Sequence, residues 1–144
     1  MRKLIVSMNV SLDGYMSGNN SGLEWHFRSW TNDMTGYARK QLSRADTILL
    51  GRNTYQTMSG YWPWQPPDNA FSKEDMAYAA MMNNFRKIVF SHSMKSSSWK
   101  NTEIVNEDIQ RYITGLKKQD GKDIIIFGSH QVIDKIIPLH LVDE

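Results

Sequence analysis

The apolar residues of this chain fall into short unbroken runs that alternate with segments in which they recur every three or four positions. The clearest case is IIIFGSHQVIDKII, residues 124–137. Its first half is a continuous apolar run, typical of a strand buried on both faces, and its second half has the spacing of one helical face. The segment therefore predicts a strand, a turn at Gly128 and a helix.

The same alternation continues along the chain and predicts an α/β domain. Strands are predicted at the short apolar runs, residues 3–10, 46–51, 87–91, 102–105 and 124–128. Helices are predicted where helical spacing or a capping residue occurs, over residues 31–43, 52–58, 72–85, 107–118 and 132–137. Because strands and helices alternate, we expect a largely parallel sheet.

One segment cannot belong to a helix interior or to a central strand. GYWPWQPPDN, residues 60–69, contains three of the four prolines, and it is predicted to be a surface loop. Such a loop cannot easily bury both Trp62 and Trp64. We expect these rings either to close over a substrate or to lie in a subunit interface.

Composition limits the classes of function that this chain can have. The 144 residues fit one domain, and 40% hydrophobic with 22% charged residues is ordinary for a globular protein and not for a membrane span. A net charge of +2 without a Lys/Arg block argues against a nucleic-acid partner. The absence of cysteine excludes thiolate nucleophiles and fits a cytoplasmic protein, and the histidines lack the spacing of a zinc site.

Candidate chemistry lies where three predicted strands end, at ILLG-RNTY (Gly51), IVF-SHS (Ser91) and IIIFG-SHQ (Gly128). Ligands of parallel sheets bind beyond the carboxyl ends of the strands, where helix N-termini offer unpaired N–H groups and a partial positive charge. A glycine there lets a phosphate approach the backbone. Each signal alone is more often a plain turn, so the hypothesis requires these strands to be neighbours.

Two such turns suit a diphosphate better than a single phosphate. Arg52 follows the first turn, and an arginine fork can share several phosphate oxygens with backbone N–H groups. The third strand end offers further donors, Ser91, His92, Ser93 and Lys95, for one more phosphate. A dinucleotide phosphate is the natural interpretation.

The motifs MNVSLDGYMSG, ILLGRNTY, KIVFSHS, IIIFGSHQVI and LVDE occur in an order and spacing that resemble the dihydrofolate reductase fold. The chain is most similar to its bacterial branch related to the C-terminal reductase domain of the bifunctional riboflavin-biosynthesis deaminase/reductase. The resemblance covers residues 1–144 as one domain. It implies a three-layer α/β/α architecture with a mostly parallel sheet, and a homodimer.

The resemblance also implies a site and a cofactor, with NADPH favoured over NADH. It places the substrate at Asn9, Asp13 and Trp25, the nicotinamide at Met8 and Met16, and the remaining NADPH contacts at Gly51, Arg52, Asn53, Thr54, Ser91, His92, Gly128, Ser129, His130 and Gln131. It identifies no catalytic residue. Asp13 precedes Gly14, and this dipeptide is equally typical of a turn.

Two departures from the family pattern limit what the resemblance implies. Folate reductases have a carboxylate where this chain has Trp30, with Asp33 the nearest acid, so folate is not the expected substrate. Family members continue past LVDE, so the C-terminal strands are expected to be missing, as in a fragment or a shortened homologue. The favoured substrate is a small heterocyclic or carbonyl/imine compound such as a ribosylaminopyrimidine. The alternative is an inactive nucleotide-binding or interaction domain.

Overall fold

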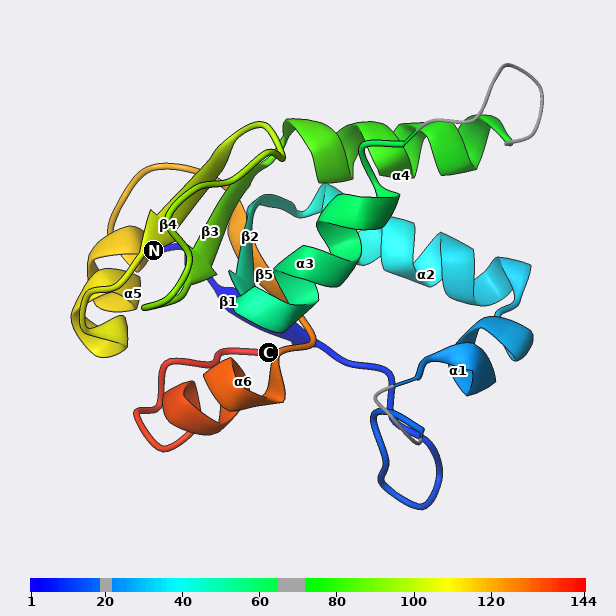
Figure 1. Cartoon of the computed structure of the whole chain (residues 1–144), viewed down its shortest axis with the longest axis horizontal. Coiled ribbons are helices and arrows are strands. Elements are labelled where there is room, and N and C mark those ends of the chain that lie inside the picture. The colour runs from blue at the N-terminus through cyan, green and yellow to red at the C-terminus, as the bar shows by residue number, and fades with distance from the viewer. Residues whose placement is uncertain (19–21, 65–71) are drawn as a thin grey trace.

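The structure is a computed structural model that describes residues 1–18, 22–64 and 72–144. Its centre is a five-stranded sheet in the order β1-β5-β2-β3-β4, in which every pairing is parallel (Figure 1). The strands are β1 (Leu4–Ser7), β2 (Ala45–Gly51), β3 (Arg86–Phe90), β4 (Thr102–Val105) and β5 (Asp123–Phe127). The helices are α1 (Glu24–Arg28), α2 (Asn32–Ser43), α3 (Arg52–Tyr61), α4 (Lys73–Asn84), α5 (Ile109–Lys117) and α6 (His130–Ile136).

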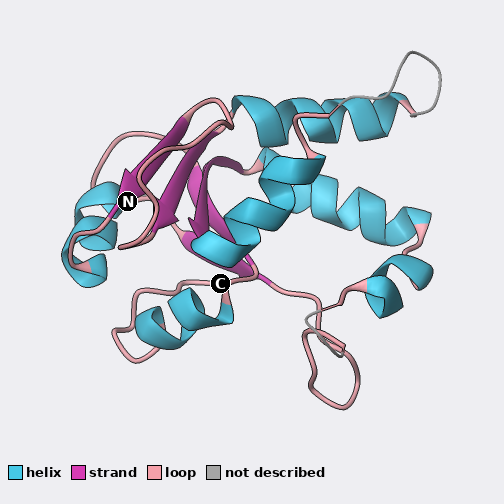
Figure 2. Ribbon diagram, in the orientation of Figure 1, coloured by secondary structure: helices cyan, strands magenta, loops and turns pink. Residues whose placement is uncertain are grey.

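The helices form a layer on each face of the sheet (Figure 2). Successive strand residues point to opposite faces, so each apolar run contributes to two cores. Ile124 and Ile126 pack with residues of α5 and α6, whereas Ile125 packs with Leu42 of α2 and Met82 of α4. The predicted three-layer α/β/α architecture with a parallel sheet is confirmed.

Capping residues place two helix starts where the sequence predicts them. The hydroxyl of Thr31 accepts a hydrogen bond from the Met34 N–H at the start of α2. Ser72 and Asp75 form a capping box at the start of α4. In both cases a side-chain oxygen satisfies an N–H group that has no partner inside the helix.

Two helices differ from the prediction. Helix α1 was not predicted because its five residues are too few to show helical periodicity, and none of them is buried. Helix α3 continues through Gly60 and Tyr61, which were predicted to be loop, and it ends before Pro63 removes an N–H donor. Residues 65–69 of the predicted loop lie outside the described residues.

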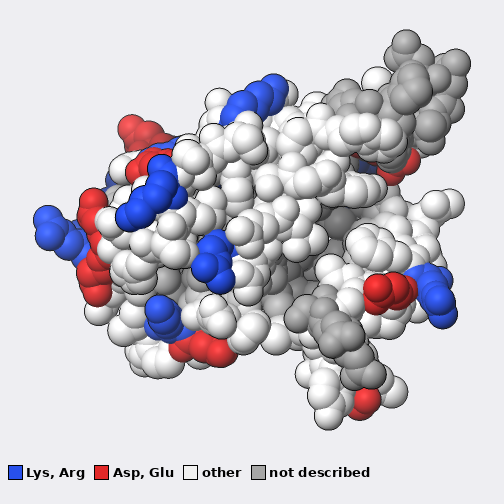
Figure 3. Space-filling view, viewed as in Figure 1, with Lys and Arg blue, Asp and Glu red and all other residues white. Residues whose placement is uncertain are grey.

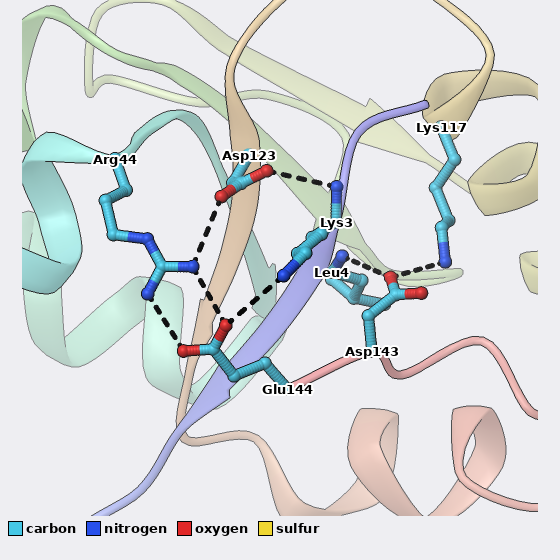
Figure 4. Close-up of polar contacts among 7 residues, drawn as sticks. All are labelled: Lys3, Leu4, Arg44, Lys117, Asp123, Asp143 and Glu144. Carbon is cyan, nitrogen blue, oxygen red and sulfur yellow. Dashed lines mark hydrogen bonds and ion pairs between the residues drawn. The ribbon is translucent and has the colours of Figure 1, made fainter.

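The last residues of the chain lie along β1 (Figure 4). The Val6 N–H donates to the Glu144 carbonyl at 2.7 Å, and the Asp143 N–H donates to the Leu4 carbonyl at 2.9 Å. The Asp143 carboxylate accepts from the Leu4 N–H and from the buried Lys117 ammonium. Residues 141–144 are not a regular strand, but they occupy the edge of the sheet beside β1, where the sequence suggests the start of a strand.

A buried lysine caps the C-terminal end of α4 by donating hydrogen bonds to its last carbonyl groups. Lys87 of β3 is fully buried, and its ammonium donates to the carbonyls of Met82, Asn83 and Phe85 at 2.7–3.1 Å. It also lies 4.6 Å from the centre of the Trp99 ring. Burial, together with the charge of Lys100, lowers the pKa of Lys87 to about 8. The lysine thus supplies hydrogen bonds that the last helical turn cannot make within the helix.

Replacing Lys87 by methionine, which keeps the apolar stem, removes the ammonium donor from these three carbonyls, of which only that of Asn83 has a further donor among the described residues, the Asn101 amide at 3.3 Å. We expect Lys87→Met to lower the free energy of unfolding by about 1–3 kcal/mol. Urea unfolding followed by circular dichroism measures this change. Lys100→Met removes an exposed lysine nearby and is expected to change stability by less than about 0.5 kcal/mol. Equal effects of the two substitutions would contradict this role of Lys87.

Asp143 should make the fold sensitive to acid. Burial raises the pKa of its carboxyl, but the hydrogen bonds from Lys117 and Leu4 outweigh burial and lower that pKa below its ordinary value of 3.8. This carboxylate therefore stabilises the fold above about pH 4, and the contribution is lost as the pH falls through the lowered pKa. In Asp143→Asn, the drop in urea midpoint between pH 5 and pH 3 is expected to be smaller than in the parent. The exposed Asp134→Asn variant controls for charge removal, and an unchanged drop in Asp143→Asn would refute the assignment.

Candidate active site

The three strand ends proposed to bind phosphate lie side by side. Strand β2 is hydrogen-bonded to β5 on one side and to β3 on the other, with Leu49 opposite Ile126 and Gly51 opposite Phe90. Because all these strands are parallel, their carboxyl ends meet at the same edge of the sheet. The requirement that the strands be neighbours is therefore met.

Ser129 joins the ends of β5 and β2. It follows Gly128, and both residues have positive φ, 64° at Ser129 and 67° at Gly128. Its hydroxyl accepts a 2.7 Å hydrogen bond from the Gly51 N–H and lies 2.8 Å from the hydroxyl of Thr54. The turn after β5 is thereby held against the start of α3.

This contact gives Gly51 a structural role. A Cβ atom at Gly51 would overlap Ser129 Oγ, so the serine hydroxyl occupies the space beside this glycine, and the predicted cofactor contact of Gly51 remains a prediction. The Gly51 N–H is also occupied by Ser129. The N–H groups available to an anion at this end of α3 are those of its first turn, from Arg52 onward.

Arg52 connects the end of β2 to the turn after β3. Its guanidinium donates to the hydroxyl of Ser93 at 3.0 Å and to the side-chain oxygen of Asn53 at 3.3 Å. The Ser91 hydroxyl accepts from the N–H groups of Ser93 and Met94 and so shapes the turn after β3. The exposed guanidinium of Arg52 thus lies between the start of α3 and the turn after β3, which carries the hydroxyl groups of Ser91 and Ser93.

These strand ends form part of one cleft of about 2330 Å³. This volume exceeds the roughly 300–1,000 Å³ of a site for a single small ligand and is large enough for a dinucleotide with a second molecule. The predicted site residues that line it are Met8, Asn9, Met16, Trp25, Gly51, Arg52, Asn53, Thr54, Ser91, His92, Gly128, Ser129, His130 and Gln131. Their individual roles remain predictions.

Asp13 is the predicted site residue that does not line this cleft. It is exposed, and its carboxylate accepts a 2.6 Å hydrogen bond from the hydroxyl of Ser11. Gly14 has a φ of 89°, as a tight turn requires. In this structure the Asp13–Gly14 pair therefore forms a turn, while its role in substrate binding remains a prediction.

His26 lines the cleft, although the sequence analysis left it without a function. Its Nε2 atom lies 2.9 Å from the amide nitrogen of Asn9. The rings of Trp25, Phe27 and Trp30 surround it edge to face, with centres 4.7–5.9 Å away. Burial lowers the pKa of His26 and favours its neutral form. The sequence signal was its position between Phe27 and Trp25, of which Trp25 is a predicted substrate residue.

A fourth strand end also lines the cleft and was missed. Residues 106–109, which follow β4, contribute Asn106, Glu107 and Asp108 to the lining. The sequence signal was the polar NED that directly follows the predicted strand TEIV. This segment contains neither glycine nor a basic residue, so its sequence does not indicate a phosphate-binding turn.

Both tryptophans of the proline-rich segment line the cleft. Trp62 is half-buried against Tyr78, with ring centres 5.3 Å apart, whereas Trp64 is 66% exposed. Both original alternatives, a contact with substrate or with a second subunit, therefore remain predictions.

Other candidate features can be checked over the ranges that the structure describes. Within them, no group of three or more histidine, aspartate or glutamate side chains is placed to hold a metal ion. No helix in the same ranges combines the length and the hydropathy needed to cross a bilayer.

The parallel sheet, its two helical layers and the cleft at the strand ends define a dihydrofolate-reductase-like α/β domain. The chain belongs to the RibD C-terminal domain family, whose model matches residues 2–144. Two proteins of Bacillus subtilis (strain 168) are similar over 143 residues and 99% of this chain. They are the uncharacterized proteins YyaP, 29% identical over 71% of its length, and YwjB, 24% identical over 73% of its length.

Solved structures show the same fold. A riboflavin biosynthesis protein of Shewanella sp. PV-4 has a TM-score of 0.67 and 20% identity, covering 99% of this chain and 73% of that one. The diaminohydroxyphosphoribosylaminopyrimidine deaminase/5-amino-6-(5-phosphoribosylamino)uracil reductase of Thermotoga maritima has a TM-score of 0.60 and 13% identity, covering 96% and 42%. Dihydrofolate reductase of Enterococcus faecalis, in complex with NADP(H) and RAB-propyl, has a TM-score of 0.55 and 17% identity, covering 95% and 65%.

The contact between Gly51 and Ser129 can be tested by a double-mutant cycle. Gly51→Ala places a methyl group against the serine hydroxyl and is expected to lower the free energy of unfolding by about 1–3 kcal/mol. Ser129→Gly removes that hydroxyl and tolerates the positive φ. The double variant is expected to lose less stability in urea unfolding than the sum of the two single variants. Strict additivity would show that the two residues do not constrain each other.

Proposed function

We propose that this protein is an NADPH-dependent reductase of a small heterocyclic or carbonyl/imine substrate. The observation that carries the proposal is the adjacency of three strand ends at one side of the cleft. Arg52, the first residue of α3 after β2, donates a hydrogen bond to Ser93 in the turn after β3. A dinucleotide with several phosphate groups suits this row of donors better than a mononucleotide does.

The residues present fit the phosphates of NADPH. The first turn of α3 offers backbone N–H groups and a partial positive charge, and Arg52 adds a full charge beside it. His92 and Ser93 lie in the turn after β3, and Ser93 accepts a hydrogen bond from the Arg52 guanidinium. We place here the 2′-phosphate that distinguishes NADPH from NADH. The turn at Gly128 and Ser129 lies at the end of β5, on the other side of β2, where we place the pyrophosphate.

The reaction requires position more than side-chain chemistry. When bound, NADPH supplies the hydride, so the chain must hold the substrate carbon close to the nicotinamide and exclude other acceptors. We assign the nicotinamide end to Met8 and Met16, which line the cleft, with Met8 directly after β1. Asn9 and His26, which are hydrogen-bonded to each other, supply polar groups on the substrate side.

Family membership supports a reductase and suggests a first compound to test. The name of the Thermotoga maritima protein includes 5-amino-6-(5-phosphoribosylamino)uracil reductase, so a ribosylaminopyrimidine belongs in any substrate panel. Fold similarity alone does not transfer a substrate. An inactive nucleotide-binding domain of the same fold is the alternative, and it predicts cofactor binding without turnover.

Quenching of tryptophan fluorescence by NADPH and by NADH tests the cofactor assignment. Arg52→Ala is expected to weaken NADPH binding by roughly tenfold and NADH binding much less, because the variant loses a charge-assisted contact to the 2′-phosphate, which NADH lacks. Lys118→Ala, which removes an equal charge from the exposed end of α5, is expected to affect neither cofactor. Equal small effects of Arg52→Ala on both cofactors would make this arginine a bystander.

Loss of reduced-cofactor absorbance with a panel of carbonyl and imine compounds tests turnover. Substrate-dependent oxidation of NADPH supports the reductase. Binding without oxidation supports the inactive alternative, and no response to either dinucleotide refutes both.

A further inference from the structure

We infer that the cleft contains a second compartment that binds a planar, uncharged aromatic substrate and disfavours a phosphorylated one. We call it the aromatic compartment and define it as the described cleft-lining residues within the ranges 23–41, 57–64 and 73–82. The inference rests on the proposed function, because it takes this compartment as the place where the substrate meets the cofactor.

The compartment concentrates apolar rings that remain open to solvent. Its lining includes Trp25, Phe27, Trp30, Tyr37, Trp62 and Tyr78. Phe27 is 66% exposed and Tyr37 is 65% exposed, so water covers surface that a folded chain normally buries. Grouped exposed apolar side chains mark a binding site, and ring faces favour a planar aromatic partner.

The same compartment is poor in positive charge. Among its described lining residues the only lysine or arginine is Lys73, which lies close in sequence to Asp75, and Asp33 adds a second negative charge. The undescribed residues 19–21 and 65–71 contain no lysine, arginine or histidine in the sequence. Figure 3 shows uncharged surface along much of the hollow beside α1 and α2, with an acidic group next to a basic one at α1.

A phosphate group would therefore lose water in this compartment without gaining an arginine fork. Bringing an anion out of water costs free energy unless a cation or several donors replace the lost hydration. The other part of the cleft differs, because Arg52 and Lys135 line it near the strand ends. The two parts thus separate a charged ligand from an uncharged one.

The geometry favours a small molecule over a second copy of the chain as the occupant. The aromatic compartment is concave and continuous with the strand-end part of the same cleft. Hydride transfer requires donor and acceptor carbons within about 3.5 Å of each other, so a substrate must share a continuous space with the cofactor. Asn9 and His26 line the same cleft, beside Trp25, and can hydrogen-bond the edge of a heterocycle.

Riboflavin and FMN make a matched pair of probes, because they share one fluorescent aromatic ring system and differ by a single phosphate. Fluorescence polarisation is measured for each with the purified protein in the absence of NADPH. We expect riboflavin to bind and FMN to bind roughly tenfold more weakly, because its phosphate finds no cationic partner.

Two substitutions place the probe in the aromatic compartment. Phe27→Ala is expected to weaken riboflavin binding by roughly tenfold, a typical loss when a stacking ring is removed. Tyr15 is exposed to the same extent, 66%, but does not line the cleft, so Tyr15→Ala is the matched control and should leave binding unchanged.

A gain of charge tests the discrimination directly. Met76 of α4 lines the compartment and is 58% exposed, so Met76→Arg adds a cation without disturbing a core. This variant is expected to shift the FMN-to-riboflavin affinity ratio by roughly tenfold toward FMN. Ala77→Arg adds the same charge at the next position, which is exposed but lies outside the lining, and should not shift the ratio.

The outcomes separate this inference from the proposed function. Tighter binding of FMN than of riboflavin, no riboflavin binding up to its solubility limit, or no effect of Phe27→Ala would overturn the inference. So would a dimer that dissociates on adding riboflavin or on Phe27→Ala, since the rings would then be a subunit interface. If riboflavin behaves as expected and neither dinucleotide binds, the proposed reductase fails while the aromatic compartment stands.

Discussion

The contact on which the cleft depends is the hydrogen bond from the Gly51 N–H to the Ser129 hydroxyl. It joins the ends of β2 and β5, whose residues are far apart in sequence, and Thr54 adds a second partner from α3. Two left-handed residues bring the serine into place, and a glycine leaves room for it. A polar turn at a strand end thereby becomes a fixed part of the cleft, which an anion-binding surface requires because its donors must hold their directions before the ligand arrives.

The elements were predictable because their signals are local. The β-branched run before Gly128, the cap at Thr31 and the capping box at Ser72 each act within a few residues, and each lies where the pattern predicted. Alternation of strands and helices also predicted the parallel sheet. Helix α1 was missed because it is too short for helical periodicity to show. Gly60 was assigned to the loop, although helix α3 continues to Tyr61 and ends only just before Pro63.

The site was predictable only in part, because its details come from tertiary contacts. The glycines lie at turns that line the cleft, but Gly51 also makes room for a serine 78 residues away, which no local pattern reveals. His26 becomes part of the site through Asn9 and through rings that gather only in the folded chain. Conversely, Asp13 carries a strong turn signal, and in the structure it bonds to Ser11 and lies outside the cleft lining.

The alternation of β5 between two cores bears on how such a protein can diversify. Ile125 belongs to the core beneath α2 and α4, which border the aromatic compartment, whereas Ile126 belongs to the core beneath α6, next to the turn at Ser129. Neighbouring residues of one strand thus support different walls. Over generations, repacking on one side of the sheet could reshape one wall of the cleft while the wall on the opposite side keeps its shape, so that one inherited scaffold offers sites of different shape.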